Sequence, residues 1–221
     1  MSVFEKWLWI KRNWLYVMEE ASDLGLVFVG GTALSLVLFK EYRASEDIDL
    51  YDPHSKAVGT AHEKELMEKL ANRLNEKGFE IRSMDERSFY IGPNIKVEVF
   101  NDGTSFKKIE KRTVDQTDVL TFDLKTYADM KMAALLCRSV YDARDLVDLF
   151  MIKKQAGITA SFPKLECDMI ENSFNERLKD IKKTKKEDLL IFQTDEQIEN
   201  LPYEEFEKFK RWLYEWLSGF R

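Results

Sequence analysis

Hydrophobic residues recur at helical spacing near the N-terminus and again through the second half of the chain. In residues 3–21, for example, Phe4, Leu8, Leu15 and Met18 follow one another four, seven and three residues apart. This periodicity predicts an amphipathic helix. Comparable patterns predict helices over residues 32–40, 61–77, 124–138, 142–155, 163–181 and 203–217.

Short runs of β-branched and aromatic residues lie between the first of these helices and predict strands. Residues 47–51 alternate charged and apolar side chains, which is the pattern of a half-buried strand. A Gly92-Pro93-Asn94 sequence separates two later runs and predicts a hairpin turn. The predicted strands are residues 26–29, 47–51, 79–82, 88–91, 95–100 and 119–122.

Only helical patterns follow residue 123, and we place a domain boundary there. The segment 1–123 is predicted to be an α/β domain with a small mixed sheet flanked by helices. The segment 124–221 is predicted to be a helical bundle appended to it, so that the chain as a whole belongs to the α+β class.

Composition narrows the class of protein without identifying it. The chain has 221 residues, 44% hydrophobic and 33% charged, as expected for a globular protein. Its longest apolar stretch, residues 24–39, is interrupted by two glycines and is too short to span a bilayer. No secretory signal pattern is found, so we expect a cytoplasmic protein. Cys137 and Cys167 lack the spacing of metal ligands and are expected to be ordinary reduced thiols.

The net charge of −6 argues against binding nucleic acid along the whole surface. Two local basic runs qualify this, and we expect each to be a solvated face rather than a nucleic-acid patch. They comprise Lys107, Lys108, Lys111 and Arg112 in one case, and Lys179, Lys182, Lys183, Lys185 and Lys186 in the other.

The first candidate for chemistry is Gly30-Gly31-Thr32, at the junction of a predicted strand and a predicted helix. Glycines allow close approach of the backbone to a ligand, and a helix N-terminus offers free N–H groups to a phosphate. A tight turn without a ligand explains the same residues, so this motif alone is weak.

The second candidate is a set of three carboxylates. Asp47 and Asp49 are two residues apart on a predicted strand, so their side chains project from the same face. Glu98 lies on another predicted strand, and if that strand is adjacent, all three carboxylates converge. Such a group suits two Mg²⁺ ions, which are commonly shared with substrate phosphates. A solvent-facing strand edge is the alternative.

Together these residues resemble the AbiEii-type nucleotidyltransferases of the DNA polymerase β-like superfamily. The resemblance is close in Val-Gly-Gly-Thr-Ala-Leu at 29–34 and in Arg-Ala-Ser-Glu-Asp-Ile-Asp-Leu at 43–50. It continues in the Lys-x-x-Ala-Leu-x-x-Arg of residues 131–138 and the Arg-Asp-Leu-Val-Asp-Leu of residues 144–149, and it is loose over residues 95–100. Four separate elements in the right order make the combination specific.

The resemblance implies a polymerase β-like nucleotidyltransferase domain and a role for each matched residue. Gly30, Gly31 and Thr32 would hold the triphosphate of an NTP; Arg43 and Ser45 would contact phosphate or close the loop; Asp47, Asp49 and Glu98 would bind Mg²⁺; Lys131 would contact phosphate; and Asp145 would be the acid of the last motif. Thr32 stands where the family often has Ser, and Glu98 where the superfamily more usually has Asp.

The family also implies transfer of NMP from an NTP to an acceptor, with RNA, particularly the tRNA 3′ end, as the leading acceptor. It includes toxins of toxin–antitoxin systems, so an antitoxin protein is an expected partner. The alternatives are transfer to a protein or small molecule, which uses the same active-site chemistry, and a non-catalytic nucleotide-binding regulatory protein.

Overall fold

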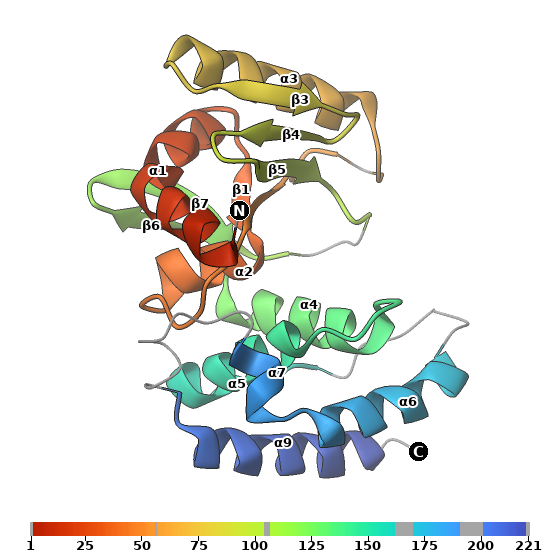
Figure 1. Cartoon of the computed structure of the whole chain (residues 1–221). Coiled ribbons are helices and arrows are strands. Elements are labelled where there is room, and N and C mark those ends of the chain that lie inside the picture. The colour runs from red at the N-terminus through yellow and green to blue at the C-terminus, as the bar shows by residue number, and fades with distance from the viewer. Residues whose placement is uncertain (1, 56, 104–106, 162–169, 191–200, 220–221) are drawn as a thin grey trace. The chain divides into compact units, whose positions relative to one another are not determined.

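The computed structural model describes residues 2–55, 57–103, 107–161, 170–190 and 201–219. The chain divides into two compact units, Met1–Asp123 and Leu124–Arg221. The first is a mixed sheet covered by helices, and the second consists of helices (Figure 1). The predicted α+β class is therefore confirmed. Among the described helices, none is both long and apolar enough to cross a membrane.

Seven strands form the sheet of the first unit, in the order β3-β4-β5-β2-β1-β7-β6. Pairing is parallel between β1 and β7 and between β2 and β5, and antiparallel elsewhere. The strands are β1 Val27–Val29, β2 Asp47–Tyr51, β3 Ile81–Met84, β4 Ser88–Ile91, β5 Ile95–Phe100, β6 Ile109–Val114 and β7 Thr117–Phe122. The sheet is therefore mixed, as predicted, and larger than expected.

The hairpin of β6 and β7 is the main difference from the predicted sheet. Strand β6 was not predicted, because its alternation of charged residues lacks the apolar face on which such predictions depend. It lies at the sheet edge, and its turn, Asp115-Gln116, has positive φ at both positions (47° and 70°). Such a turn matches the twist of the strands it connects but usually contains Gly or Asn. The Asp-Gln sequence therefore did not predict a hairpin turn.

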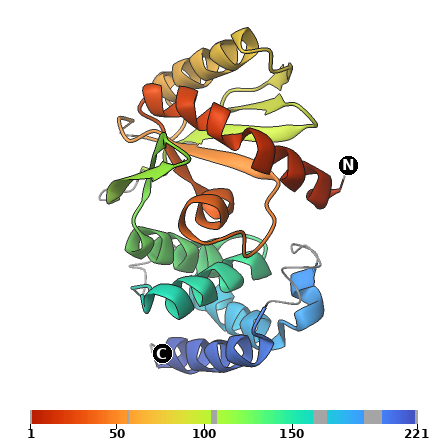
Figure 2. The same cartoon turned by 90° about the vertical axis from the view of Figure 1, so that its left-hand side faces the viewer.

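Two long helices, α1 (Val3–Asp23) and α3 (Ala61–Glu76), pack on this sheet (Figure 2). A capping box between Ser2 and Glu5 begins α1, and the hydroxyl of Thr60 caps α3. Helix α1 contacts β1 and β7, whereas α3 contacts β3, β4 and β5. Large buried side chains between helices and sheet, including Trp7, Ile10, Phe28, Met67 and Phe89, form the core.

The helix predicted over residues 32–40 begins earlier and changes type. Helix α2 covers Gly30–Ala33, and the chain then widens into a π-helix, η1, over Leu34–Leu38. The amide of Phe39 donates to the carbonyl of Leu34, five residues back, over 2.8 Å. A single π-helical turn of this kind often occurs at functional sites.

The second unit contains α4 (Leu124–Cys137), α5 (Ala143–Ala156), α6 (Ile170–Lys183), α7 (Lys186–Leu190) and α9 (Tyr203–Ser218). Helices α4 and α5 lie side by side, as do α6 and α9 (Figure 1). The short α7 was not predicted. Residues 162–169, which include Cys167 and the start of the predicted helix 163–181, lie outside the described residues. Cys137 is half-buried and forms no disulfide with a described residue.

Candidate functional site

Strand β2 displays two carboxylates on one face. Asp47 and Asp49 are half-buried, whereas Ile48 and Leu50 between and after them are fully buried. The alternation arises because successive side chains of a strand project to opposite faces. In the parallel register with β5, Asp49 lies opposite Glu98. We call Asp47, Asp49 and Glu98 the carboxylate platform.

A lysine that the sequence had not singled out lies within this platform. Lys96 is opposite Asp47 in the register, and its Nζ lies 2.5 Å from Oε2 of Glu98. Burial alone would lower the pKa of Lys96, but the hydrogen bond and charge of Glu98, with the charge of Asp49, raise it. The only sequence signal was its position two residues before Glu98 on the same strand.

The glycine turn packs directly against Asp49. Gly30 has φ +77°, a conformation that side chains other than hydrogen rarely allow. A β-carbon on Gly30 would lie 2.2 Å from Oδ2 of Asp49. Two features therefore exclude a side chain at position 30: the positive φ of the backbone and the carboxylate of Asp49 beside it.

The second glycine makes room for an arginine. A β-carbon on Gly31 would lie 1.8 Å from Nη2 of Arg43, a residue that is only 3% exposed. The guanidinium also donates through Nη1 to the carbonyl of Ala44 over 2.9 Å, and Ser35 donates its hydroxyl to the carbonyl of Arg43 over 2.7 Å. Arg43 thus fixes the loop between η1 and β2 and brings positive charge to the glycine turn.

Two hydroxyls hold the first carboxylate in place. Thr32, which is buried, donates its hydroxyl to the backbone carbonyl of Asp47 over 2.6 Å. Ser45 donates its hydroxyl to Oδ1 of Asp47 over 3.3 Å. In this arrangement the hydroxyl of Thr32 positions strand β2, and its expected role in holding the triphosphate stays a prediction.

The platform fits a divalent cation in part. Asp47 and Asp49 supply hard oxygen donors from one strand face, the chemistry that Mg²⁺ prefers. Within the described ranges, however, no three His, Cys, Asp or Glu side chains converge closely enough to form a metal-binding group. Glu98, the expected third ligand, is instead paired with Lys96.

The second unit contains its own buried charge cluster. Lys131 on α4 lies 2.8 Å from Oδ1 of Asp145 and 2.7 Å from Oδ2 of Asp148, both on α5. Asp145 and Asp148 are 1% and 0% exposed, and Arg138 lies 3.1 Å from the other oxygen of Asp145. The ammonium of Lys131 is therefore held by two carboxylates, of which only Asp145 had been predicted as a site residue.

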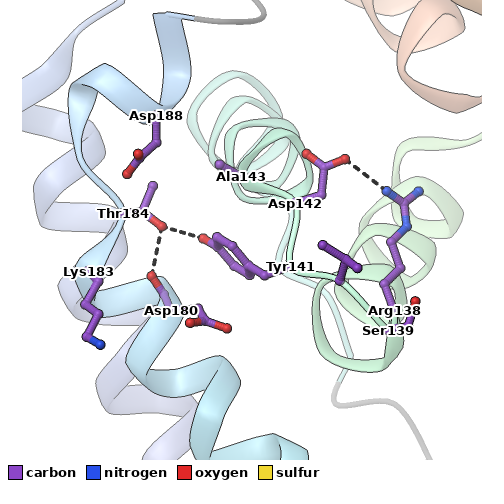
Figure 3. Close-up of a pocket in the computed structure, with 10 residues that line it drawn as sticks. Arg138, Ser139, Tyr141, Asp142, Ala143, Asp180, Lys183, Thr184 and Asp188 are labelled. Atoms are coloured by element: carbon purple, nitrogen blue, oxygen red, sulfur yellow. Dashed lines mark hydrogen bonds and ion pairs between the residues drawn. The ribbon is translucent and has the colours of Figure 1, made fainter.

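An open cavity of about 660 Å³ adjoins this cluster within the second unit. Tyr141 and Thr184 lie inside it, with their hydroxyls 2.6 Å apart, and the Arg138–Asp142 ion pair lies on its other side (Figure 3). Asp142 also caps α5 by accepting from the amide of Arg144.

The two basic runs have different environments. Each cation of the first run pairs with a carboxylate: Lys107 with Asp102, Lys108 with Asp123, Lys111 with Asp118 and Arg112 with Glu110. In the second run, Lys182 and Lys186 lie over the rings of Tyr214 and Tyr203, and Lys183 lines the cavity. The first run is largely neutralised by these pairs. Lys108, Lys111 and Arg112 are exposed, as expected of a solvated face, whereas the side chain of Lys107 is only 6% exposed and lies over the ring of Tyr51.

The chain is similar to known nucleotidyltransferases in sequence and in fold. Residues 15–214 match the family model described as "Nucleotidyl transferase AbiEii toxin, Type IV TA system". Among solved structures, the chain is similar to that of an antigenic nucleotidyltransferase-like protein from Paracoccidioides brasiliensis, with 16% identity and a TM-score of 0.50. That match covers 75% of this chain and 85% of the other, and at this identity it concerns the fold alone. No curated protein matches the chain.

Proposed function

Because this chain belongs to the AbiEii nucleotidyl transferase family, we propose that it transfers a nucleoside monophosphate from an NTP to an acceptor hydroxyl and releases pyrophosphate. One observation carries the proposal. The carboxylate of Asp49 packs against Gly30, so the acidic strand and the glycine turn form a single surface. That surface offers oxygen donors for a cation beside a backbone that a phosphate can approach closely.

These residues are expected to catalyse transfer mainly by positioning the acceptor and the triphosphate and by neutralising charge. The acceptor oxygen forms a bond to the α-phosphorus, and the bond from that phosphorus to the bridging oxygen of pyrophosphate breaks. The proton of the acceptor hydroxyl passes to solvent through a carboxylate of the platform. Mg²⁺ bound at Asp47 and Asp49, with Glu98 as a third donor, would neutralise charge on the triphosphate.

Neighbouring residues prepare this surface for the substrate. Thr32 and Ser45 fix the backbone and side chain of Asp47, which limits the orientations of its carboxylate. Because Gly31 has no side chain, the buried Arg43 guanidinium lies directly beside the glycine turn and supplies positive charge there.

The roles proposed for Lys131 and Asp145 rest on contacts within the second unit. We assign Lys131 to phosphate contact, as the family resemblance implies. Asp145 and Asp148 hold its ammonium from two sides and orient it. Asp145 is then a positioning residue that acts through Lys131.

For the acceptor, we propose RNA, with the tRNA 3′ end as the first substrate to try, and an antitoxin protein as the partner. The antitoxin follows from the description of the family as the toxin of a TA system, whereas the RNA acceptor is what the resemblance to the family implies. A protein or small-molecule acceptor is the second candidate. The acidic net charge and the paired first basic run favour it, since both reduce attraction to a polyanion.

Labelled transfer tests the activity and separates the acceptors. The full chain is incubated with Mg²⁺, each α-phosphate-labelled NTP, and total RNA, protein or small hydroxyl compounds in separate reactions. Label in RNA supports the first acceptor, and label in protein or small compounds supports the second. Absence of label from every reaction, under conditions where the chain is folded, overturns the proposed activity.

Substitutions then locate the activity. Asp47→Asn and Asp49→Asn keep the side-chain shape and are expected to lower transfer at least about a thousandfold, because the charge that holds the cation is removed. Asp118→Asn is the matched control, since Asp118 lies on β7 and pairs with Lys111 at the surface. Normal transfer by either platform variant would refute the assignment of the site.

A further inference from the structure

A positive side chain lies in a group that would otherwise contain only carboxylates. Lys96 and Glu98 are two residues apart on β5, so they share a face of the sheet. The parallel register places them opposite Asp47 and Asp49, respectively. One ammonium and three carboxylates thus occupy four adjoining positions on two strands.

The pairing inside this block is not symmetrical. The ammonium of Lys96 is hydrogen-bonded to Glu98 at 2.5 Å, and the two side chains are 39% and 28% exposed. Asp47 instead accepts a hydroxyl from Ser45, and Asp49 packs on Gly30. The direct hydrogen bond of the Lys96 ammonium within the platform is therefore the one to Glu98.

The pairing of Lys96 with Glu98 reduces the electrostatic repulsion among the three carboxylates. Three carboxylates in adjoining positions repel one another unless positive charge lies among them. Lys96 supplies that charge from the chain itself. A divalent ion that approaches the same carboxylates is repelled by the Lys96 ammonium. To bind the hydrogen-bonded oxygen of Glu98, the ion must displace this ammonium.

We propose that Lys96 is a built-in counter-cation of the carboxylate platform, which competes with the divalent ion for Glu98 and so keeps metal affinity low in the absence of nucleotide. The proposal rests on the proposed function, because it assumes that the platform is where the metal binds. Lys96 is a positioning residue in this scheme, acting through Glu98.

Direct metal binding tests the proposal without any measurement of transfer. Mn²⁺ is titrated into the full chain without nucleotide, and free Mn²⁺ is measured by electron paramagnetic resonance. Lys96→Met keeps the length of the side chain and removes its charge, and we expect it to tighten Mn²⁺ binding about tenfold, the size of effect for a unit charge near a divalent ion in a partly solvated site.

Two control variants separate local charge from other effects. Lys96→Arg keeps the positive charge and should bind Mn²⁺ within about twofold of the wild type. Lys69→Met removes an equal charge from an exposed ion pair with Glu65 on α3, and should leave Mn²⁺ affinity unchanged. Unfolding by heat, monitored for every variant, verifies that the variants compared are folded.

A double-variant cycle then identifies Glu98 as the point of competition. If the ammonium acts through Glu98, Lys96→Met should tighten Mn²⁺ binding much less in a Glu98→Gln background than in the wild type. Equal or weaker Mn²⁺ binding by Lys96→Met than by the wild type overturns the proposal, as does an undiminished effect in the Glu98→Gln background. If Asp47→Asn and Asp49→Asn leave Mn²⁺ binding intact, the platform is not the metal site, and the proposed function fails instead.

Discussion

Thr32 donates its hydroxyl to the backbone carbonyl of Asp47 over 2.6 Å and so connects the glycine turn to the acidic strand. The two residues are fifteen positions apart, and most of the chain between them forms η1 and the loop that Arg43 closes. Thr32 is buried, being only 1% exposed. The position of the Asp47 carboxylate therefore depends on a side chain that need not contact substrate.

Removal of this hydroxyl should reduce both stability and activity. Thr32→Val keeps the shape of the side chain but leaves the Asp47 carbonyl without its donor, which costs about 1–3 kcal/mol in unfolding free energy. We expect Thr32→Ser to restore most of this loss, because it restores the donor. Chemical denaturation and labelled transfer measure the two effects. A Thr32→Val variant as stable and active as the wild type would show that the bond does not position β2.

Gly30 should tolerate no side chain, for a reason specific to the site. In Gly30→Ala, the new methyl group would collide with Oδ2 of Asp49 at 2.2 Å, so Asp49 must move and transfer should fall at least about a hundredfold. Gly59→Ala is the matched control, since Gly59 has a similar φ of +70° but no atom within 4 Å of the added carbon. Both variants share a backbone cost of about 1 kcal/mol. Equal transfer by the two variants would mean that the contact with Asp49 has no role.

The sequence was most informative where one physical constraint dominated. The bounds of β2, β4 and β5 were predicted correctly because buried apolar residues alternate with polar ones, and this alternation also put Asp47 and Asp49 on one face. Strand β6 was missed because an edge strand with charged residues on both faces has no such alternation. The π-helical turn depends on a hydrogen bond five residues back, which no spacing of apolar residues reveals.

Partners of polar side chains were harder to predict than the elements that carry them. The family resemblance implied phosphate contact for Thr32, and phosphate contact or loop closure for Ser45. The direction in which each hydroxyl donates depends on the tertiary position of Asp47. Lys96 was not predicted as a site residue, because a lysine on a strand is usually solvated. Its proximity to Glu98 follows from strand geometry, whereas its proximity to Asp47 and Asp49 follows from the pairing of β2 with β5, which the sequence does not specify.

Alkaline pH should destabilise the protein through Tyr141. Burial raises the pKa of its hydroxyl to about 12, from an ordinary value of 10.0, although the hydrogen bond with Thr184 opposes this shift (Figure 3). A raised folded-state pKa means that the stability is fully present below pH 10 and is lost as pH rises through 12, at about 1.4 kcal/mol per unit of pKa difference.

The comparison with Tyr141→Phe isolates this effect from other titrating groups. The variant should be about 1 kcal/mol less stable near pH 7, where it lacks the hydrogen bond, and should lose less stability than the wild type between pH 10 and 12. Unfolding free energies from denaturant titrations at each pH give both values. Parallel pH profiles for the two proteins would contradict the attribution to Tyr141.

Lys131 should be essential to the stability of the second unit as well as to the proposed activity. Lys131→Met would leave the carboxylates of Asp145 and Asp148, which are almost fully buried, without the ammonium they share. Loss of one partner from a buried ion cluster typically costs about 3–5 kcal/mol. Lys125→Met, on the same helix, removes an exposed pair with Asp129 and should cost less than about 1 kcal/mol.

A second substitution separates this electrostatic cost from simple loss of packing. If loss of the ammonium charge is the cause, adding Asp148→Asn to Lys131→Met should recover stability, because one of the two carboxylates that lost the Lys131 ammonium is then neutral. Transfer activity should not return with stability, since the proposed phosphate contact of Lys131 is still absent. Recovery of both would assign Lys131 a purely structural role, and recovery of neither would contradict the attribution of the lost stability to unpaired charge.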